Sequence, residues 1–173
     1  MRRGEVLGLR REDLDLQEGR LSITQTVVLV DGHPVISEPK TSKGRRSISL
    51  DPATVAGLST HLRTQAEERL AWGPAYRDSG LLFTREDGTG VHPEAFADRF
   101  GVIAKRAKLP RIRLHDLRHS YAVVSLAAGI HLKVVSERLG HATIAITLDT
   151  YSHVLPSMDE EAASTVAALI LGA

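Results

Sequence analysis

The sequence predicts a mainly helical α+β fold with a small three-stranded antiparallel sheet near the N-terminus. Residues 20–50 are rich in β-branched side chains and contain hairpin turn signals. Most of the chain after residue 51 instead has apolar side chains at helical spacing, interrupted by glycine and proline. The 173 residues, 42% hydrophobic and 25% charged, have the size and composition of one globular domain.

The three strands are expected between residues 20 and 50. The first covers the apolar positions of 20–30, and Asp31-Gly32 after it is a strong hairpin signal. The second is centred on Val35-Ile36, and the third is 45–50, where polar and apolar side chains alternate. These strands are predicted to pair as one antiparallel sheet.

Helical spacing is visible over residues 2–9 and again from residue 51. Asp51 is the expected N-cap of a long helix, with Pro52 at its first position and an end near Ala71. The apolar face of this helix is predicted to be Val55, Leu58, Leu62, Ala66 and Leu70.

Proline and glycine mark the later helices. Pro93 starts one, with Phe96, Phe100, Ile103 and Ala104 on its inner side, and residues 81–83 before it form a short buried segment. Helices are also predicted over 114–128, 132–139, 143–151 and 157–171. Gly129 and Gly140 follow the first two of these, as expected for residues just beyond a helix end.

Composition restricts the function. The chain has no cysteine, which excludes disulfides, thiolate metal sites and cysteine catalysis. A net charge of +1 does not indicate nucleic-acid binding, but residues 99–118 hold seven Lys/Arg against one acid, either an anion-facing surface or a solvated helix face. The start has no signal peptide and no apolar run is long enough for a bilayer, so we expect a cytoplasmic protein without a membrane partner.

His115, Arg118 and His119 are candidates for phosphate chemistry. His115 and Arg118 share a helix face, where a guanidinium can hold a phosphate and an imidazole can move a proton. His119 could join His115 on a metal ion, but the sequence lacks a His-Glu-x-x-His pattern or an obvious third ligand. We therefore expect His119 to pack inside and make a hydrogen bond. Alone, His-x-x-Arg is a weak motif that a helix-surface pair also explains.

His141 and Tyr151 extend this set. His141 follows a predicted helix end, where a side chain can meet a ligand while the helix stays packed. Tyr151 lies ten residues later; a tyrosine becomes a nucleophile only with a base and a positive setting that stabilise its phenolate. Taken alone, Tyr151 is better explained as a half-buried structural tyrosine.

The ordered set resembles the catalytic domain of the tyrosine recombinases, the phage integrase family, over essentially the whole chain. The matching segments are Met1–Leu9, Glu38–Thr41 with Arg45-Arg46, Leu114–Ser120, Leu139–His141 and Leu148–Val154. The resemblance implies a single catalytic domain, 1–173, that is N-terminally incomplete and lacks the separate N-terminal core-binding domain. We accordingly expect the isolated chain to bind DNA weakly and to recombine poorly or not at all.

The resemblance also implies site-specific recombination of double-stranded DNA, as in integration or excision, with other recombinase protomers in a synaptic complex. Arg2 and Arg118 would clamp the scissile phosphate, and Lys40 would protonate the departing 5′ oxygen. His115 would be the base or a proton relay.

Two further residues of the site follow from the same resemblance. His141 would hydrogen-bond the phosphate, and Tyr151 would attack it to form a 3′-phosphotyrosyl bond. No metal or cofactor is implied. Glu5, one helical turn after Arg2, either orients that arginine or is an ordinary surface acid.

Several alternatives stay open at this point. The chain could be a catalytically inactive DNA-binding remnant, a type IB topoisomerase-like nicking enzyme or a histidine-based metal hydrolase. The final helix, with Ala162, Val166, Ala167, Ile170 and Leu171 as an apolar strip, either docks on a neighbouring protomer or packs on its own domain.

Overall fold

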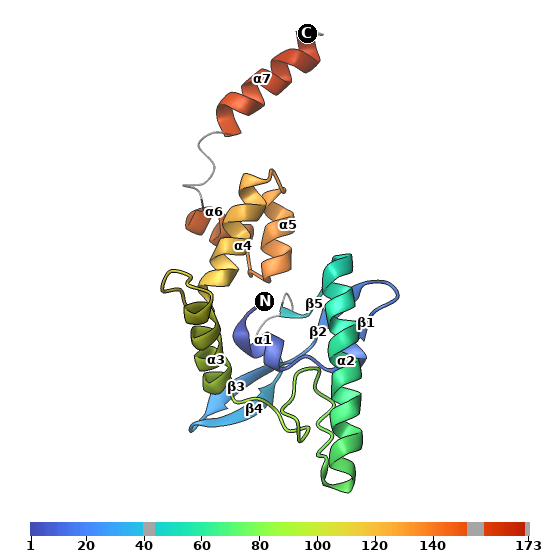
Figure 1. Cartoon of the computed structure of the whole chain (residues 1–173). Helices are drawn as coiled ribbons and strands as arrows, with labels where there is room; N and C mark the ends of the chain where they lie inside the picture. Colours follow the sequence, from blue (N-terminus) through green and yellow to red (C-terminus); the bar gives the residue numbers. More distant parts are fainter. Residues whose placement is uncertain (40–43, 152–157, 172–173) are drawn as a thin grey trace.

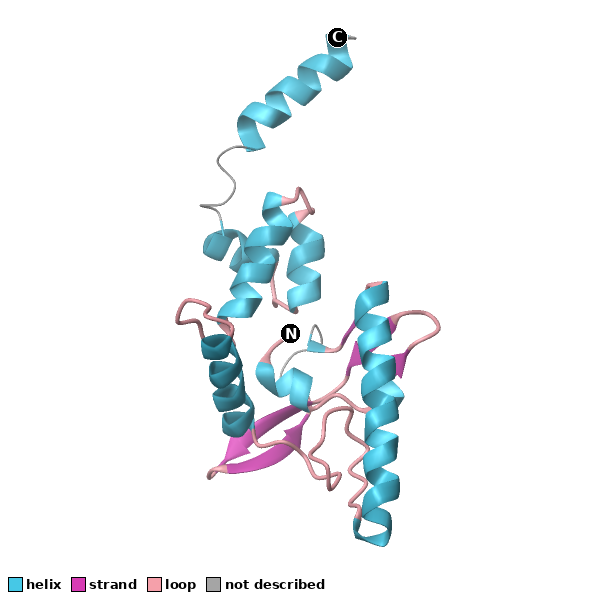
Figure 2. Ribbon diagram, viewed as in Figure 1, coloured by secondary structure: helices cyan, strands magenta, loops and turns pink. Residues whose placement is uncertain are grey.

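A computed structural model describes residues 1–39, 44–151 and 158–171, and it confirms the mainly helical α+β class (Figures 1 and 2). Helix α1 (Arg3–Leu7) lies near the centre of the molecule. The sheets lie on one side of it, and on the other side lies a helical cluster. That cluster consists of α4 (Asp116–Ala127), α5 (Leu132–Leu139) and α6 (Ile144–Tyr151).

The described residues contain two antiparallel sheets where one was predicted. The three-stranded sheet has the order β1-β2-β5, and the β3-β4 hairpin forms a separate sheet. The strands are β1 (Leu14–Asp15), β2 (Arg20–Ile23), β3 (Thr26–Val30), β4 (His33–Ser37) and β5 (Arg46–Ser49). The predicted hairpin at Asp31-Gly32 is confirmed, with both residues at positive φ.

Polar side chains divide the predicted first strand into β2 and β3. Thr24 donates to the carboxylate of Asp13 at 3.1 Å, in the 3-10 helix η1 (Arg11–Asp13). Gln25 donates to the carbonyl of Gly8 at 2.8 Å. These two contacts tie the chain to the segment that follows α1, so β3 starts a new sheet.

Helix α2 (Pro52–Trp72) begins as predicted, because the Asp51 side chain accepts from the backbone N–H of Thr54 at 3.0 Å. Its inner face was predicted incorrectly in its second half: Ala66 and Leu70 are exposed, Leu70 at 82%. Gln65 is buried there instead. Its amide donates to the carbonyls of Leu81 and Leu82 and to the Thr84 hydroxyl. These hydrogen bonds give the polar groups of the irregular segment beneath the helix a partner.

Helix α3 (Pro93–Arg106) starts at the predicted proline and is followed by α4. Phe96 and Phe100 are partly buried and Ala104 is buried, but Ile103 is 54% exposed, so its predicted inward position was wrong. The short buried segment at 81–83 is confirmed, with Leu82 fully buried. A short 3-10 helix, η3 (Gly73–Ala75), follows α2.

Two apolar clusters hold these elements. The first joins the segment after α1 to the sheet and contains Leu9, Leu21, Ile23, Ile48 and Leu82. The second joins α4, α5 and α6 and contains Ala122, Leu126, Val135, Leu139 and Tyr151. Polar contacts between the clusters, rather than a shared apolar core, therefore position the candidate site.

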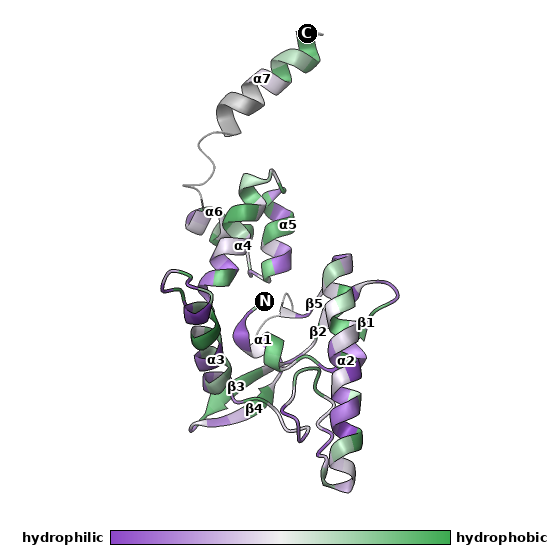
Figure 3. Ribbon diagram, viewed as in Figure 1, coloured by the Kyte–Doolittle hydropathy of each residue, from purple (hydrophilic) through white to green (hydrophobic). Residues whose placement is uncertain are grey.

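Helix α7 (Met158–Leu171) lies apart from the other helices in Figure 1. Its residues 164–171 are all exposed, and its last turns are strongly apolar (Figure 3). In the structure, residues 164–171 therefore do not pack on the rest of the domain. No helix among the described residues has the length and apolar character needed to cross a membrane.

Candidate active site

Three arginines from distant parts of the chain converge on the C-terminus of α5. The carbonyl oxygens of residues 138–140 accept hydrogen bonds from Arg46, Arg118 and Arg2 in that order. The N···O distances are 3.0 Å, 2.6 Å and 3.5 Å. The last carbonyls of a helix lack partners within it and form the negative end of its dipole, so they attract cations. This helix end fixes where the three guanidiniums meet.

Glu5 connects two of these arginines from the other side. Its carboxylate accepts from the Arg2 guanidinium at 3.0 Å and from both terminal nitrogens of Arg46, the closer at 2.9 Å. Glu5 is only 5% exposed; burial opposes its charge, but the hydrogen bonds from Arg46 and Arg2 outweigh burial and lower its pKa to about 2. Glu5 thus orients Arg2, and the alternative of a surface acid was wrong.

Gly140 is required by this arrangement. Its φ is 69°, in the left-handed region that favours glycine. A Cβ at this position would lie 2.5 Å from a terminal nitrogen of Arg46. The glycine of Leu139-Gly140-His141 therefore ends α5 and also makes room for the guanidinium that holds Glu5.

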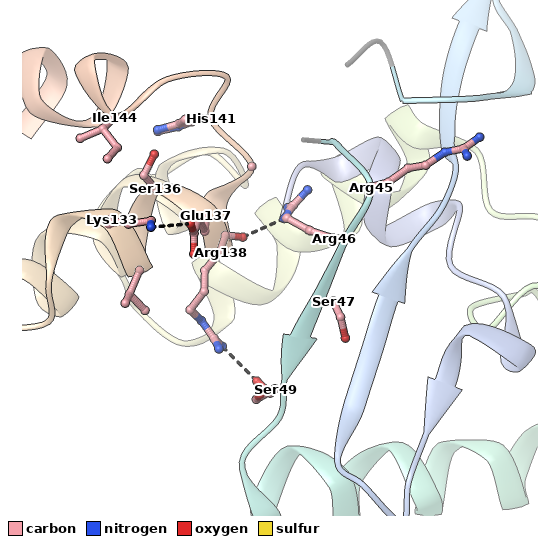
Figure 4. Close-up of a pocket in the computed structure, with 12 residues that line it drawn as sticks. Arg45, Arg46, Ser47, Ser49, Lys133, Ser136, Glu137, Arg138, His141 and Ile144 are labelled. Carbon is pink, nitrogen blue, oxygen red and sulfur yellow. Dashed lines mark hydrogen bonds and ion pairs between the residues drawn. The ribbon is translucent and has the colours of Figure 1, made fainter. Parts of the chain in front are cut away.

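Arg46 and its neighbour Arg45 have opposite environments. Figure 4 shows Arg46 directed from β5 toward α5 across a cavity of about 510 Å³, with Arg45 directed away. The side chain of Arg46 is 8% exposed, whereas that of Arg45 is 59% exposed and pairs with the exposed Glu38. The alternation of polar and apolar side chains over residues 45–50 did not predict that the side chain of Arg46 would be covered.

We expect Arg46→Met to lower the free energy of unfolding by about 3 kcal/mol, because it leaves the Glu5 carboxylate buried without its main partner. Arg45→Met, which removes only an exposed pair, is the matched control and should cost less than about 1 kcal/mol. Urea unfolding measures both. Equal small losses for the two variants would contradict the role given to Arg46.

Arg118 is held deep in the site. It is 7% exposed, and one of its terminal nitrogens donates to Leu139. The other, Nη1, is buried with no hydrogen-bond partner in the part of the chain that the structure describes. Burial, with the nearby charge of Arg2, lowers the Arg118 pKa to about 10, so the guanidinium stays charged at neutral pH. A buried cationic N–H without an acceptor is the feature expected at an anion site.

Tyr151 lies at the end of α6 with its ring in the second apolar cluster, 3% exposed. Its hydroxyl oxygen is 2.7 Å from Nδ1 of His119, which confirms the predicted hydrogen bond of His119, whose side chain is partly buried. Burial raises the pKa of Tyr151, and the nearby Arg118 charge offsets part of that rise. His115 precedes α4 and contacts the edge of the His119 ring, with the ring centroids 5.0 Å apart.

His141 faces the same arginines. Its Nδ1 lies 2.7 Å from the Thr147 hydroxyl, which leaves Nε2 for another partner. Burial and the charges of Arg118, Arg2 and Arg46 lower the pKa of His141 to about 4. The imidazole is therefore neutral at neutral pH and can donate through one nitrogen only.

The structure brings most of the predicted site together. Arg2, His115 and Arg118 line one cavity of about 820 Å³, and His141 lines the neighbouring one. Lys40 lies outside the described residues. Among the described residues, no group of three or more His, Asp or Glu side chains could hold a metal ion. Sequence reasoning missed the contribution of Arg46 and the direct contact of His119 with Tyr151.

Comparisons with known proteins agree with this geometry. The sequence pattern of the phage integrase family matches residues 1–158. The chain belongs to the phage integrase family. Its similarity to a tyrosine recombinase XerC-like protein of Caldanaerobacter subterraneus subsp. tengcongensis is 32% identity over 96% of the chain and 46% of that protein. A putative prophage phiRv2 integrase of Mycobacterium tuberculosis is 33% identical over 98% of the chain and 43% of the relative.

Solved structures of integrases and recombinases share the fold. The Tn1549 transposon integrase in complex with transposon right end DNA superposes with a TM-score of 0.74 at 22% identity, over 87% of this chain and 50% of that one. XerA recombinase superposes with a TM-score of 0.70 at 21% identity, over 95% of this chain and 52% of that one. The present integrase-family chain thus spans about half the length of the proteins it matches.

Proposed function

We propose that this chain carries the catalytic site of a site-specific DNA recombinase, which cleaves and rejoins DNA strands through a covalent 3′-phosphotyrosyl intermediate. The observation that carries the proposal is the buried Nη1 of Arg118, which has no hydrogen-bond partner among the described residues. It lies in a site where Arg2, His141 and a tyrosine hydroxyl are also within electrostatic reach. A phosphodiester would supply the missing acceptor oxygen.

Each residue has a role in this proposal. Arg2 and Arg118 bind the non-bridging oxygens, where negative charge grows in the transition state. His141 donates from Nε2 to the same phosphate, since its Nδ1 is occupied by Thr147. Lys40 protonates the 5′ oxygen as it leaves, and His115 acts as a base or proton relay.

In the cleavage step, the Tyr151 oxygen bonds to phosphorus and the bond from phosphorus to the 5′ oxygen breaks. The phosphotyrosyl bond keeps the energy of the phosphodiester, so a 5′ hydroxyl from another strand can reverse the step. Tyr151 is 3% exposed, with its ring in the apolar cluster and its hydroxyl next to His119. Nucleotide hydrolysis has no part in this scheme.

The proposed partners are double-stranded DNA and further recombinase protomers, and the proposed location is the cytoplasm. The exposed apolar residues at the end of α7 fit a protomer contact, because large apolar side chains on a free helix favour burial against another protein. These residues include Val166, Leu169, Ile170 and Leu171.

The test is covalent adduct formation on a duplex with a nick next to the cleavage position, which loses the short fragment and traps the intermediate. We expect the wild-type chain to form a denaturant-resistant protein–DNA adduct on this nicked duplex, even though complete recombination by the isolated chain is expected to be poor. A chelator should not reduce the amount of adduct. Transfer of the bound strand to a second duplex distinguishes a recombinase from a nicking topoisomerase. DNA binding without any adduct would instead favour the catalytically inactive remnant.

A further inference from the structure

The phenol of Tyr151 and the imidazole of His119 are in direct contact. The family resemblance gave His119 no catalytic role. Tyr151 Oη lies 2.7 Å from His119 Nδ1, within hydrogen-bond distance, and in the tautomer whose Nδ1 carries no proton the phenol donates to it. His115, the residue offered as the base, contacts the His119 ring edge, and the described residues contain no hydrogen bond between His115 and Tyr151. Of the two histidines, His119 is therefore the one at the reacting atom.

We infer that His119 is a further catalytic residue, which accepts the Tyr151 proton during strand cleavage. The inference rests on the proposed function. As Tyr151 Oη forms its bond to phosphorus, its proton passes to Nδ1 of His119. The bond to the 5′ oxygen breaks, and that oxygen takes its proton from the general acid proposed above. His119 ends the step as an imidazolium next to Arg118, and the reverse step returns the proton to the phenol.

The position of His119 suits this role for geometric reasons. It follows Arg118 on α4, so the backbone that places the phosphate-binding guanidinium also places the proton acceptor. The neighbouring His141 contacts Thr147 through Nδ1, and its Nε2 is the nitrogen proposed above for the phosphate. A base must lie within hydrogen-bond reach of the proton it takes, and His119 meets this condition in the DNA-free chain.

The titratable groups that interact with His119 lie on two sides of its ring. His115 and Asp116 approach from α4, and His141 and Tyr151 approach from the α5–α6 side. A pH profile of cleavage therefore reports on His119 only when the variant is compared with the wild-type chain under identical conditions.

His119→Asn separates proton transfer from positioning. The Asn oxygen can accept the phenol hydrogen bond near the place of Nδ1, but it cannot take up the proton. We expect His119→Asn to bind DNA like the wild-type chain and to form adduct about 10²–10⁴-fold more slowly at neutral pH. The deficit should shrink as pH rises, because hydroxide then replaces the missing base. His33→Asn, at an exposed histidine of β4, is the matched control and should keep the wild-type rate.

The measurements are single-turnover adduct formation between about pH 6 and pH 10, thermal melting and DNA affinity, with His119→Gln as a second variant should the Asn variant melt early. Wild-type rates in both variants overturn the inference and leave the proposed function intact. A loss of the same size at every pH also overturns it, since that result indicates a structural role. Absence of an adduct with the wild-type chain overturns the proposed function, and the inference with it.

Discussion

Tyr151→Phe is expected to abolish the covalent adduct while the fold and DNA affinity are kept. Phenylalanine fills the same place in the cluster with Ala122, Leu126, Val135 and Leu139, so packing changes little. The hydrogen bond to His119 is lost, and the chain has no cysteine that could replace the nucleophile. The effect should therefore fall on chemistry alone.

The measurement is denaturing electrophoresis of protein bound to the nicked duplex, with melting temperature and DNA affinity recorded in parallel. Tyr121→Phe is the matched control, because Tyr121 also lies on the helical cluster, where its hydroxyl accepts from Arg138 at 2.7 Å. It should still form the adduct. An adduct that persists in Tyr151→Phe would assign the nucleophile to another residue and would remove the chemical basis of the proposal.

The helical part of the fold could be predicted because its limits depend on local backbone chemistry. Pro52 and Pro93 supply a helix start, and Gly129 and Gly140 adopt the positive φ of a helix end. These effects act within one or two turns, so a single sequence contains them. The same holds for the hairpin at Asp31-Gly32.

The parts that could not be predicted depend on contacts far apart in the sequence. Gln65 is buried because it satisfies carbonyls 16 and 17 residues away, and Arg46 because it meets Glu5, 41 residues away. Each has the sequence signature of a surface residue. Motif order therefore located the candidate catalytic residues and suggested Glu5 as a positioning residue, while the contribution of Arg46 was visible only in the structure.

The convergence at the end of α5 also explains why the site combines cations that repel one another. Arg2 and Arg46 share the Glu5 carboxylate, and each of the three arginines donates to one of the carbonyls at 138–140. The carboxylate and the helix end compensate part of this charge in the DNA-free chain. Among the described residues Arg118 Nη1 is left without an acceptor, and a phosphate oxygen is the acceptor that we propose for it.

Arg118→Lys is accordingly expected to slow adduct formation by about 10²–10³-fold, close to the loss for Arg118→Ala. One nitrogen of Arg118 is committed to Leu139 and the other is free for phosphate. A lysine has a single nitrogen and cannot reproduce this planar, two-sided contact, although it keeps the charge.

Single-turnover rates at saturating DNA separate this loss from weaker binding. Arg113→Lys is the control, since Arg113 is an 82% exposed arginine that pairs with Asp116 and should tolerate the change. If the Arg118→Lys variant kept most of the wild-type rate, positive charge alone would suffice at this position. The Nη1 atom without a partner among the described residues would then no longer be evidence for a phosphate site, because a point charge can act without the planar geometry of a guanidinium.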